Sequence, residues 1–276
     1  MGAIRVGPAD APSRESPELA VELLAARGYD ACELGLESGF WLDYEFAGRL
    51  GELARAHDVA LSVHAPLFAF PGHPDDRKAR MALGALDRCA GIATAAAAEL
   101  VVIHPGFWLG RDRERTLADV AASLERLREK LIAKERLVPF GIEVMGRVRE
   151  LGSLDDVVDL AARVDFVRPV LDFAHLHATS DGGYAEPEAF TSALAAVDAV
   201  LEPDAPFHVH FSDIAYANRN ETKHLRYGEG TLRAEPLAAA LARFERPATV
   251  ISESPDEAST LAIRRVLYEA GASTGA

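Results

Sequence analysis

Short apolar segments alternate with longer segments of helical periodicity along the whole chain, and this alternation constrains the fold most strongly. Eight of the short segments are typical of buried strands: residues 4–7, 31–35, 60–64, 100–104, 140–143, 169–172, 207–210 and 249–253. A helical segment follows each of them, at residues 19–27, 44–57, 77–97, 115–134, 154–162, 187–200, 236–243 and 257–270. Eight such repeats predict a (β/α)8 TIM barrel, with an open doubly wound sheet as the alternative.

Length and composition restrict the class of protein further. A chain of 276 residues suits one large α/β domain, so residues 1–276 are predicted to form a single barrel domain. Its two cysteines, Cys32 and Cys89, have no metal-type spacing, so we expect a reduced, cytoplasmic setting. No apolar run resembles a signal peptide or could span a membrane. The net charge of −14 argues against binding nucleic acid over the whole surface, although bound cations would offset part of it.

Six consecutive predicted strands end in a residue that can bind a metal ion. These residues are His64, His104, Glu143, Asp172, His210 and Glu253. In a parallel barrel the strand ends share the C-terminal face, where active sites of this fold are built. Any one of them could simply begin a loop or cap a helix, but three carboxylates brought together repel one another unless cations lie between them. Three imidazoles with three carboxylates predict a mixed nitrogen and oxygen site for zinc, manganese or iron.

Further histidines lie close to these strand ends in the sequence. His175 follows the sixth strand and His224 follows the seventh, and both could bind an additional metal ion on the same face. His208 should point the same way as His210, one layer deeper in the barrel, because alternate residues of a strand share a face. We interpret His208 as an interior residue rather than a ligand.

The predicted loops on the C-terminal face combine basic and aromatic residues. Arg147 follows the fifth strand, Arg226 belongs to a long loop after the seventh, and Trp108 follows the fourth. Such a mixture around a metal site suits a phosphate-bearing ligand with bases that can stack, so these three residues are candidates for substrate binding. A solvated rim with aromatic residues covering the barrel is the competing interpretation.

Seven motifs together resemble the endonuclease IV family, especially its shorter archaeal-type members. They are VHAPL (63–67), VIHPG (102–106), GIEVMG (141–146), LDFAHLHA (171–178), HVHFSD (208–213), KHLRYGEG (223–230) and ISESP (251–255). The resemblance implies a TIM barrel with a trinuclear zinc cluster, which cleaves DNA on the 5′ side of abasic sites in base excision repair. It implies abasic DNA as the partner, with no obligate protein partner, and a monomer is adequate for this chemistry.

The resemblance also implies roles for individual residues. The ligands divide into His64 with His104, then Glu143 with Asp172, His210 and Glu253, and finally His175 with His224. Glu143 would bridge two of two or three divalent ions, expected to be zinc, with manganese or iron as alternatives. A hydroxide held between the metals would attack phosphorus, and Glu143 would orient or deprotonate it as the catalytic residue.

Two positions depart from the family pattern. The family has an aspartate two residues before the histidine of the KHL-like motif, where this chain has Thr222. Either the third metal is absent or the adjacent Glu221 has taken over. The family often has a tyrosine after HAP that enters the DNA at the lesion, where this chain has Leu67. Phe68 or another aromatic residue would have to substitute for it.

A sugar isomerase or epimerase with a related barrel is the strongest alternative function. Its single metal site would use Glu143, Asp172, His210 and Glu253, so these residues do not distinguish the two functions. The four additional histidines favour the nuclease, whereas Leu67 and the acidic net charge favour the epimerase. A metal-binding barrel without catalysis is a third possibility, and the intact Glu143 argues against it.

Overall fold

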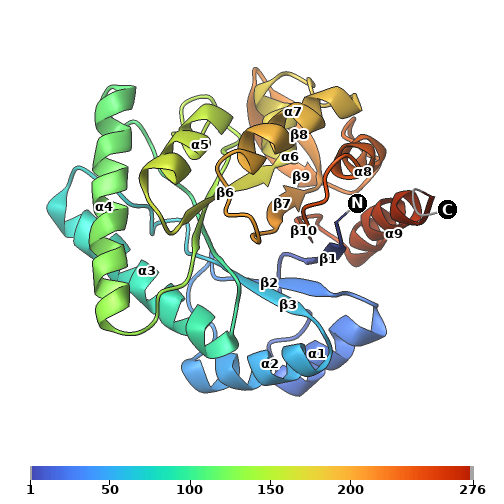
Figure 1. Ribbon diagram of the computed structural model, residues 1–276, viewed down its shortest axis with the longest axis horizontal. Helices are drawn as coiled ribbons and strands as arrows, with labels where there is room; N and C mark the ends of the chain where they lie inside the picture. The colour runs from blue at the N-terminus through green and yellow to red at the C-terminus, as the bar shows by residue number, and fades with distance from the viewer. Residues whose placement is uncertain (1, 274–276) are drawn as a thin grey trace.

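The computed structural model describes residues 2–273, in which eight parallel strands form one sheet that curls into a nearly closed barrel (Figure 1). The order of the strands in the sheet is β1-β10-β7-β6-β5-β4-β3-β2. Their bounds are β1 (Ile4–Pro8), β2 (Ala31–Gly35), β3 (Ala60–His64), β4 (Val101–Ile103), β5 (Phe140–Glu143), β6 (Val167–Asp172), β7 (Phe207–Phe211) and β10 (Ala248–Ser252). The predicted (β/α)8 TIM barrel is therefore confirmed.

Apart from the short, buried helix at residues 173–179, the helices surround the barrel on the outside (Figure 1). They are α1 (Pro17–Ala26), α2 (Tyr44–Ala56), α3 (Asp76–Ala96), α4 (Arg113–Ala133), α5 (Leu154–Arg163), α6 (Phe173–Thr179), α7 (Pro187–Asp198), α8 (Ala234–Leu241) and α9 (Glu257–Ser273). Side chains fix where several helices begin. The Ser153 side chain accepts a hydrogen bond from the backbone of Asp156, and the Asp156 side chain accepts one from the backbone of Ser153, so α5 begins with a capping box.

The seam between β1 and β2 closes the barrel through a side chain. The Asp30 carboxylate accepts a hydrogen bond from the backbone N–H of Val6 at 2.6 Å, and the Asp30 N–H donates to the Val6 carbonyl at 3.3 Å. Gly7 allows the two strands to approach, because a Cβ there would lie 1.7 Å from the carbonyl oxygen of Ala31. Tyr268 of α9 donates to the other Asp30 oxygen at 2.5 Å, so the last helix stabilises the seam.

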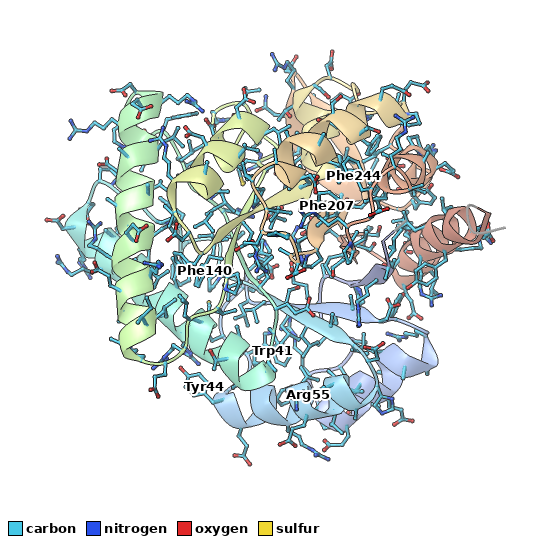
Figure 2. The ribbon with its side chains drawn as sticks, in the orientation of Figure 1. Trp41, Tyr44, Arg55, Phe140, Phe207 and Phe244 are labelled. Carbon is cyan, nitrogen blue, oxygen red and sulfur yellow. The ribbon has the colours of Figure 1, made fainter. Side chains whose placement is uncertain are left out.

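Aromatic side chains pack where strands begin, at the N-terminal end of the barrel. The rings of Phe207 on β7 and Phe244 meet edge to face at a centroid distance of 5.3 Å (Figure 2). The ring centroids of Phe140 on β5 and Phe166 are 5.4 Å apart. Phe140 and Phe207 are fully buried. Packing of this kind stabilises the end of the barrel opposite the predicted site.

The long loop predicted after β7 is instead an antiparallel hairpin of β8 (Asp213–Ala217) and β9 (Asn220–Leu225). The prediction was wrong because β9 is polar and partly exposed and shows no apolar alternation. The connecting residues Asn218 and Arg219 both have positive φ, 52° and 62°, as a two-residue hairpin turn requires. Arginine is unusual at such a position, so the turn carries a weak sequence signal.

Two strands end one residue earlier than predicted. β4 ends at Ile103 and β10 at Ser252, so His104 and Glu253 are the first residues beyond their strands. Within residues 2–273, every helix is too short or too polar to cross a membrane.

Candidate metal centre

The barrel brings the six predicted strand-end residues together at its C-terminal face. Ligand atoms of Glu143, Asp172, His210 and Glu253 all lie within 4.8 Å of one another. A second group, made of His64, His104 and Glu143, meets the same criterion. Glu143 belongs to both groups, and the two groups therefore form one continuous centre.

The two oxygens of Glu143 face different parts of this centre. Glu143 Oε2 lies 3.2 Å from His64 Nε2 and 3.0 Å from His104 Nε2, whereas Oε1 lies 3.2 Å from His210 Nδ1. The side chain is 1% exposed, so the surrounding barrel fixes its position. A carboxylate in this position could bridge two metal ions.

Electrostatics indicate that the centre fits cations. Asp172 is fully buried, and its Oδ2 has no hydrogen-bond partner among residues 2–273. Burial raises the pKa of Asp172 to about 7, and the charges of Glu253 and Glu143 contribute to the rise. Burial alone would also raise the pKa of Glu253, but the neighbouring His210 outweighs it and lowers that pKa to about 2. Oδ2 lies 3.3 Å from His175 Nδ1. A buried oxygen without a hydrogen bond, beside two other carboxylates, is a suitable ligand for a divalent ion.

Two imidazoles of the centre, those of His64 and His210, have raised pKa values in the protein alone. Burial alone would lower the pKa of His64, but the hydrogen bond and charge of Glu143 outweigh it and raise this pKa to about 10. The pKa of His210 is also well above its usual range, because the charges of Glu33, Glu253 and Glu143 outweigh burial. Protons on these rings balance the buried carboxylates, and divalent cations could replace those protons.

A third group of possible ligands consists of His175, Glu221 and His224. His175 lies on α6, and its Nε2 is 2.8 Å from Glu221 Oε2. His224 Nδ1 lies 2.6 Å from the Ser212 hydroxyl. The approach depends on Gly146, where a Cβ would lie 2.6 Å from His175 Cδ2 and 2.7 Å from Glu221 Cγ.

A bulge in the hairpin explains why Glu221, rather than Thr222, belongs to this group. Ala215 pairs with Lys223 and Tyr216 pairs with Glu221, which leaves Thr222 as the extra residue on β9. Because a bulge changes the alternation of side chains, Glu221 joins His224 in the group. The Thr222 hydroxyl donates to the carbonyl of Ala215 at 2.9 Å. Of the two alternatives at this position, the geometry favours replacement of the aspartate by Glu221.

Two acidic residues near the centre escaped the sequence analysis. Glu33 of β2 is fully buried, and its Oε2 is 3.1 Å from His208 Nε2 while its Oε1 is 3.0 Å from His210 Nε2. His208 lies in the interior beside it, as expected. Glu37 Oε1 lies 3.4 Å from His64 Nδ1. The signal for Glu33 was a charged residue in the middle of an otherwise uncharged, buried strand, ACELG.

The three candidates for substrate binding lie on the C-terminal face, but both arginines already have acidic partners. Arg147 lies 3.4 Å from Glu150 and 3.2 Å from Glu221, and Arg226 lies 2.8 Å from Asp256. Trp108 is half-buried and lines a cavity of about 450 Å³ that Arg147 also lines. Their role in binding a substrate stays a prediction.

Exposed apolar side chains follow three of the strands that carry the centre. Leu67 and Phe68 follow β3, and their exposed fractions are 51% and 56%. Phe107 and Leu109 follow β4, and Val148 follows β5; these three are also exposed. Apolar groups on the loops of this face can contact a ligand that has its own flat or apolar surfaces.

Comparison with known proteins reveals relatives of different kinds. An uncharacterized protein of Methanocaldococcus jannaschii is 29% identical over 245 residues, which cover 88% of each chain. A protein described as probable endonuclease 4, from Aster yellows witches'-broom phytoplasma, is 26% identical over 181 residues, which cover 63% of this chain and 60% of that one.

Solved structures with the same fold include proteins with both candidate functions. A D-tagatose 3-epimerase-like protein has a TM-score of 0.74 at 21% identity, with 95% of this chain and 96% of that chain covered. Endonuclease IV from Thermus thermophilus also has a TM-score of 0.74, at 17% identity, with 99% and 100% covered. Residues 21–271 match a family described as xylose isomerase-like TIM barrel. The chain belongs to the xylose isomerase-like TIM barrel family.

Proposed function

We propose that the protein is a metal-dependent endodeoxyribonuclease that hydrolyses the phosphodiester bond 5′ to abasic sites in DNA. The observation that carries this proposal is the extension of the ligand set beyond one ion. Glu143, Asp172, His210 and Glu253 would suffice for a single metal. A one-metal centre would not need the remaining members of the other two groups, which are His64, His104, His175, Glu221 and His224. The phytoplasma relative described as probable endonuclease 4 supports the same assignment.

Hydrolysis of a phosphodiester requires an oriented water molecule and stabilisation of negative charge. Bound divalent cations would supply a lowered water pKa and would offset charge on the phosphoryl oxygens. Glu143 is central to both ligand groups, so its carboxylate can orient the attacking water or accept its proton. Leu67 and Phe68, three and four residues after His64, are exposed where they can contact bases beside the lesion.

One observation favours sugar epimerisation as a second candidate. Several arginines of the C-terminal face are paired with carboxylates, as Arg147 is with Glu221, Arg226 with Asp256 and Arg233 with Asp213. Paired arginines attract a DNA backbone less than free ones do. A neutral sugar does not need them, and the four-residue group around Glu143 would be adequate for it.

The test uses a duplex oligonucleotide with one abasic site and protein loaded with zinc or manganese. We expect a single incision 5′ to the site that leaves a 3′-hydroxyl. Glu143→Ala should abolish it, whereas Glu52→Gln should not, because Glu52 lies on α2 with an exposed carboxylate paired to Arg49. Well-folded, metal-loaded protein that leaves the duplex intact but epimerises a ketose would overturn the proposal in favour of the second candidate.

A further inference from the structure

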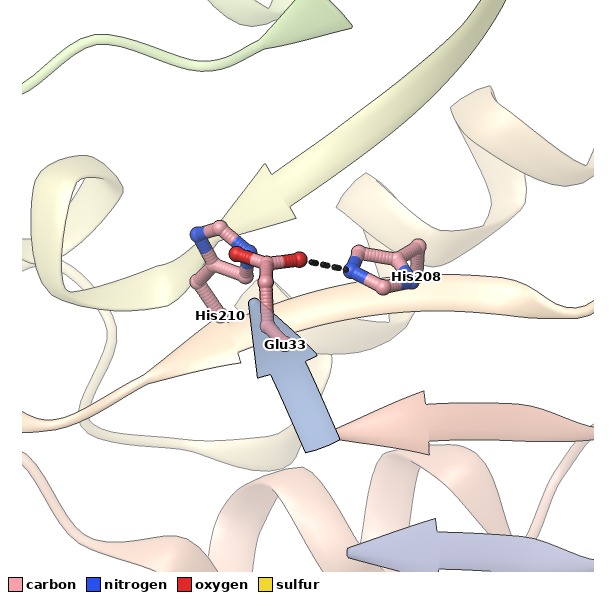
Figure 3. Close-up of side chains that lie close together, drawn as sticks. All are labelled: Glu33, His208 and His210. Carbon is pink, nitrogen blue, oxygen red and sulfur yellow. Dashed lines mark hydrogen bonds and ion pairs between the residues drawn. The ribbon is translucent and has the colours of Figure 1, made fainter. Parts of the chain in front are cut away.

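A second buried layer of polar side chains lies beneath the metal centre. Glu33 extends from β2, and His208 and His210 extend from β7 (Figure 3). These two strands are not neighbours in the sheet, so the side chains meet across the interior of the barrel. Their exposed fractions are 0%, 7% and 0%, so any polar atom here must find its partner within the protein.

The two ring nitrogens of His210 face opposite sets of partners. Nδ1 points into the metal centre, 3.2 Å from Glu143 and 3.3 Å from Glu253. Nε2 points the other way and lies 3.0 Å from Glu33 Oε1. Although close, Nε2 and Oε1 are not aligned for a hydrogen bond, and both lack any other partner among residues 2–273. The separation of 3.0 Å is already that of a hydrogen bond, so only the alignment of the two groups is missing.

Glu33 is itself held firmly. Its Oε2 accepts a hydrogen bond from the Ser62 hydroxyl at 2.7 Å and lies 3.1 Å from His208 Nε2, as the dashed line in Figure 3 marks. These contacts occupy Oε2 and leave Oε1 for His210. In metal sites, a ligand histidine usually donates its second ring N–H to a carboxylate, which fixes the tautomer and the orientation of the ring.

We propose that Glu33 is a positioning residue for the metal centre. Its Oε1 accepts the Nε2–H of His210, so that Nδ1 carries the lone pair and is presented to a metal ion beside Glu143 and Glu253. His208 and Ser62 act through Glu33 by fixing its carboxylate. The inference rests on the metal centre of the proposed function but is independent of the substrate.

The competing interpretation is a separate metal ion bound by Glu33, His208 and His210. Their ligand atoms lie close enough together for one. Against it, Glu33 Oε2 already has two hydrogen-bond partners, and the layer is almost completely closed to solvent. The positioning role keeps both hydrogen-bond partners of Oε2 and requires one new hydrogen bond, between Oε1 and His210 Nε2, which already lie 3.0 Å apart.

The decisive variant is Glu33→Gln, which keeps the shape of the side chain. Its amide oxygen can still accept from Ser62 and His208, which places the amide N–H₂ against His210 Nε2. The amide would donate to Nε2 and favour the tautomer with the proton on Nδ1, which cannot bind a metal. We expect the affinity for one zinc ion to fall by about 10–100-fold, as is typical when such a partner is lost. The number of sites that saturate at high zinc should be unchanged.

The experiment titrates metal-free wild-type and variant protein with zinc alone by calorimetry, and records histidine ¹⁵N NMR spectra of the loaded protein. Wild-type spectra should show His210 protonated at Nε2 and bound through Nδ1, with this signature weakened in Glu33→Gln. Ser62→Ala removes one support of Glu33 and should weaken zinc binding in the same direction by a few-fold, so it preserves the test if Glu33→Gln fails to fold.

Two results would overturn the inference. The first is that both Glu33→Gln and Ser62→Ala bind zinc with wild-type affinity and give the wild-type His210 spectrum. The other is loss of one whole equivalent of zinc in Glu33→Gln with the remaining affinities unchanged, which would make Glu33 a ligand of a separate ion. Failure of the proposed function would be seen differently, as wild-type protein that binds zinc normally but does not incise abasic DNA.

Discussion

The two ends of the barrel are built from the same strands but differ in how their charged side chains are partnered. At the C-terminal end, buried carboxylates and imidazoles crowd together, and Asp172 Oδ2 has no hydrogen-bond partner among residues 2–273. At the N-terminal end, charged groups are matched: Arg246 lies 2.5 Å from Asp198, and Arg168 lies 3.1 Å from Glu202. The first end has groups of side chains that could hold cations, whereas the ion pairs of the second end stabilise the fold.

The larger of two cavities, one at each end of the barrel, does not lie at the candidate metal centre. A cavity of about 760 Å³ opens at the N-terminal end, lined by Pro139, Pro203, Pro206 and Pro247 among others. A cavity of about 400 Å³ at the C-terminal end reaches His224 and Glu253. Among residues 2–273, none of those that line the cavity at the N-terminal end belongs to a group that could hold a metal ion. Convergent ligands therefore locate the candidate site better than volume does.

The largest expected effect is on catalysis at the C-terminal end. Glu143→Ala should reduce incision of abasic DNA by about 10³-fold or more, because it removes both the shared ligand and the group that orients water. Incision rates under single-turnover conditions, with metal content measured alongside, would check this. Full nicking activity in Glu143→Ala would contradict the assignment of the catalytic residue.

Removal of metal ions from the C-terminal end should lower the stability of the protein. An ion that binds only the folded state at 100 times its Kd adds about 2.7 kcal/mol of stability per site. Chelation should therefore lower the Tm by roughly 5–10 °C for each ion removed, since 1 kcal/mol corresponds to about 2–4 °C for a chain of this size. Differential scanning calorimetry with and without chelator would measure the shift. An unchanged Tm would mean that the C-terminal end holds no tightly bound ion.

A substitution at the N-terminal end should change the stability of the protein but not its metal binding or activity. Arg246→Ala removes the ion pair with Asp198 and a hydrogen bond to the carbonyl of Ala205, and should lower the free energy of unfolding by roughly 1–3 kcal/mol. Zinc content and incision rate per folded molecule should match wild type. Urea denaturation would measure the stability, and the nicking assay would measure the activity. Loss of activity without loss of stability would contradict the assignment of separate roles to the two ends.

The pH dependence of stability should have opposite signs in the two regions. In metal-free protein, the pKa of Asp172 is raised to about 7, chiefly by burial, so folding takes up a proton. Stability should therefore fall as pH rises from about 4 to about 7, and Asp172→Asn should remove this slope of roughly 1 kcal/mol per pH unit. Urea denaturation of chelated protein across this range is the measurement. A slope that survives in Asp172→Asn would contradict the assignment.

Asp87 provides the contrasting control, away from the centre. Burial alone would raise its pKa, but hydrogen bonds from Lys134 and Lys130 outweigh it and lower the pKa. Its contribution is therefore present above its unfolded pKa of about 3.9 and is lost as pH falls through the lower folded value. Asp87→Asn should reduce stability near neutral pH by about 1 kcal/mol or less and leave the slope between pH 4 and 7 unchanged.

Local patterns predicted the barrel and the metal-competent residues at its strand ends, because each depends on a few consecutive residues. VVIH and FGIE each show an apolar run that finishes in a metal-competent residue. Glu33 was missed because its partner His208 lies 175 residues away along the chain. The role of Glu221 depends on a bulge at Thr222, and the register of a hairpin is a property of both strands together. Long-range contacts of this kind require the folded structure.

The most direct test of the central claim is to locate the bound metal ions in crystals of zinc-loaded protein by anomalous diffraction at the zinc edge. We expect one peak shared by Glu143, His64 and His104, and a second between Glu143, Asp172, His210 and Glu253. A third is expected at His175, Glu221 and His224, with no peak in the N-terminal cavity. One ion at the Glu143, Asp172, His210 and Glu253 group, with the histidines of the other two groups empty, would contradict the multi-metal centre and the nuclease assignment.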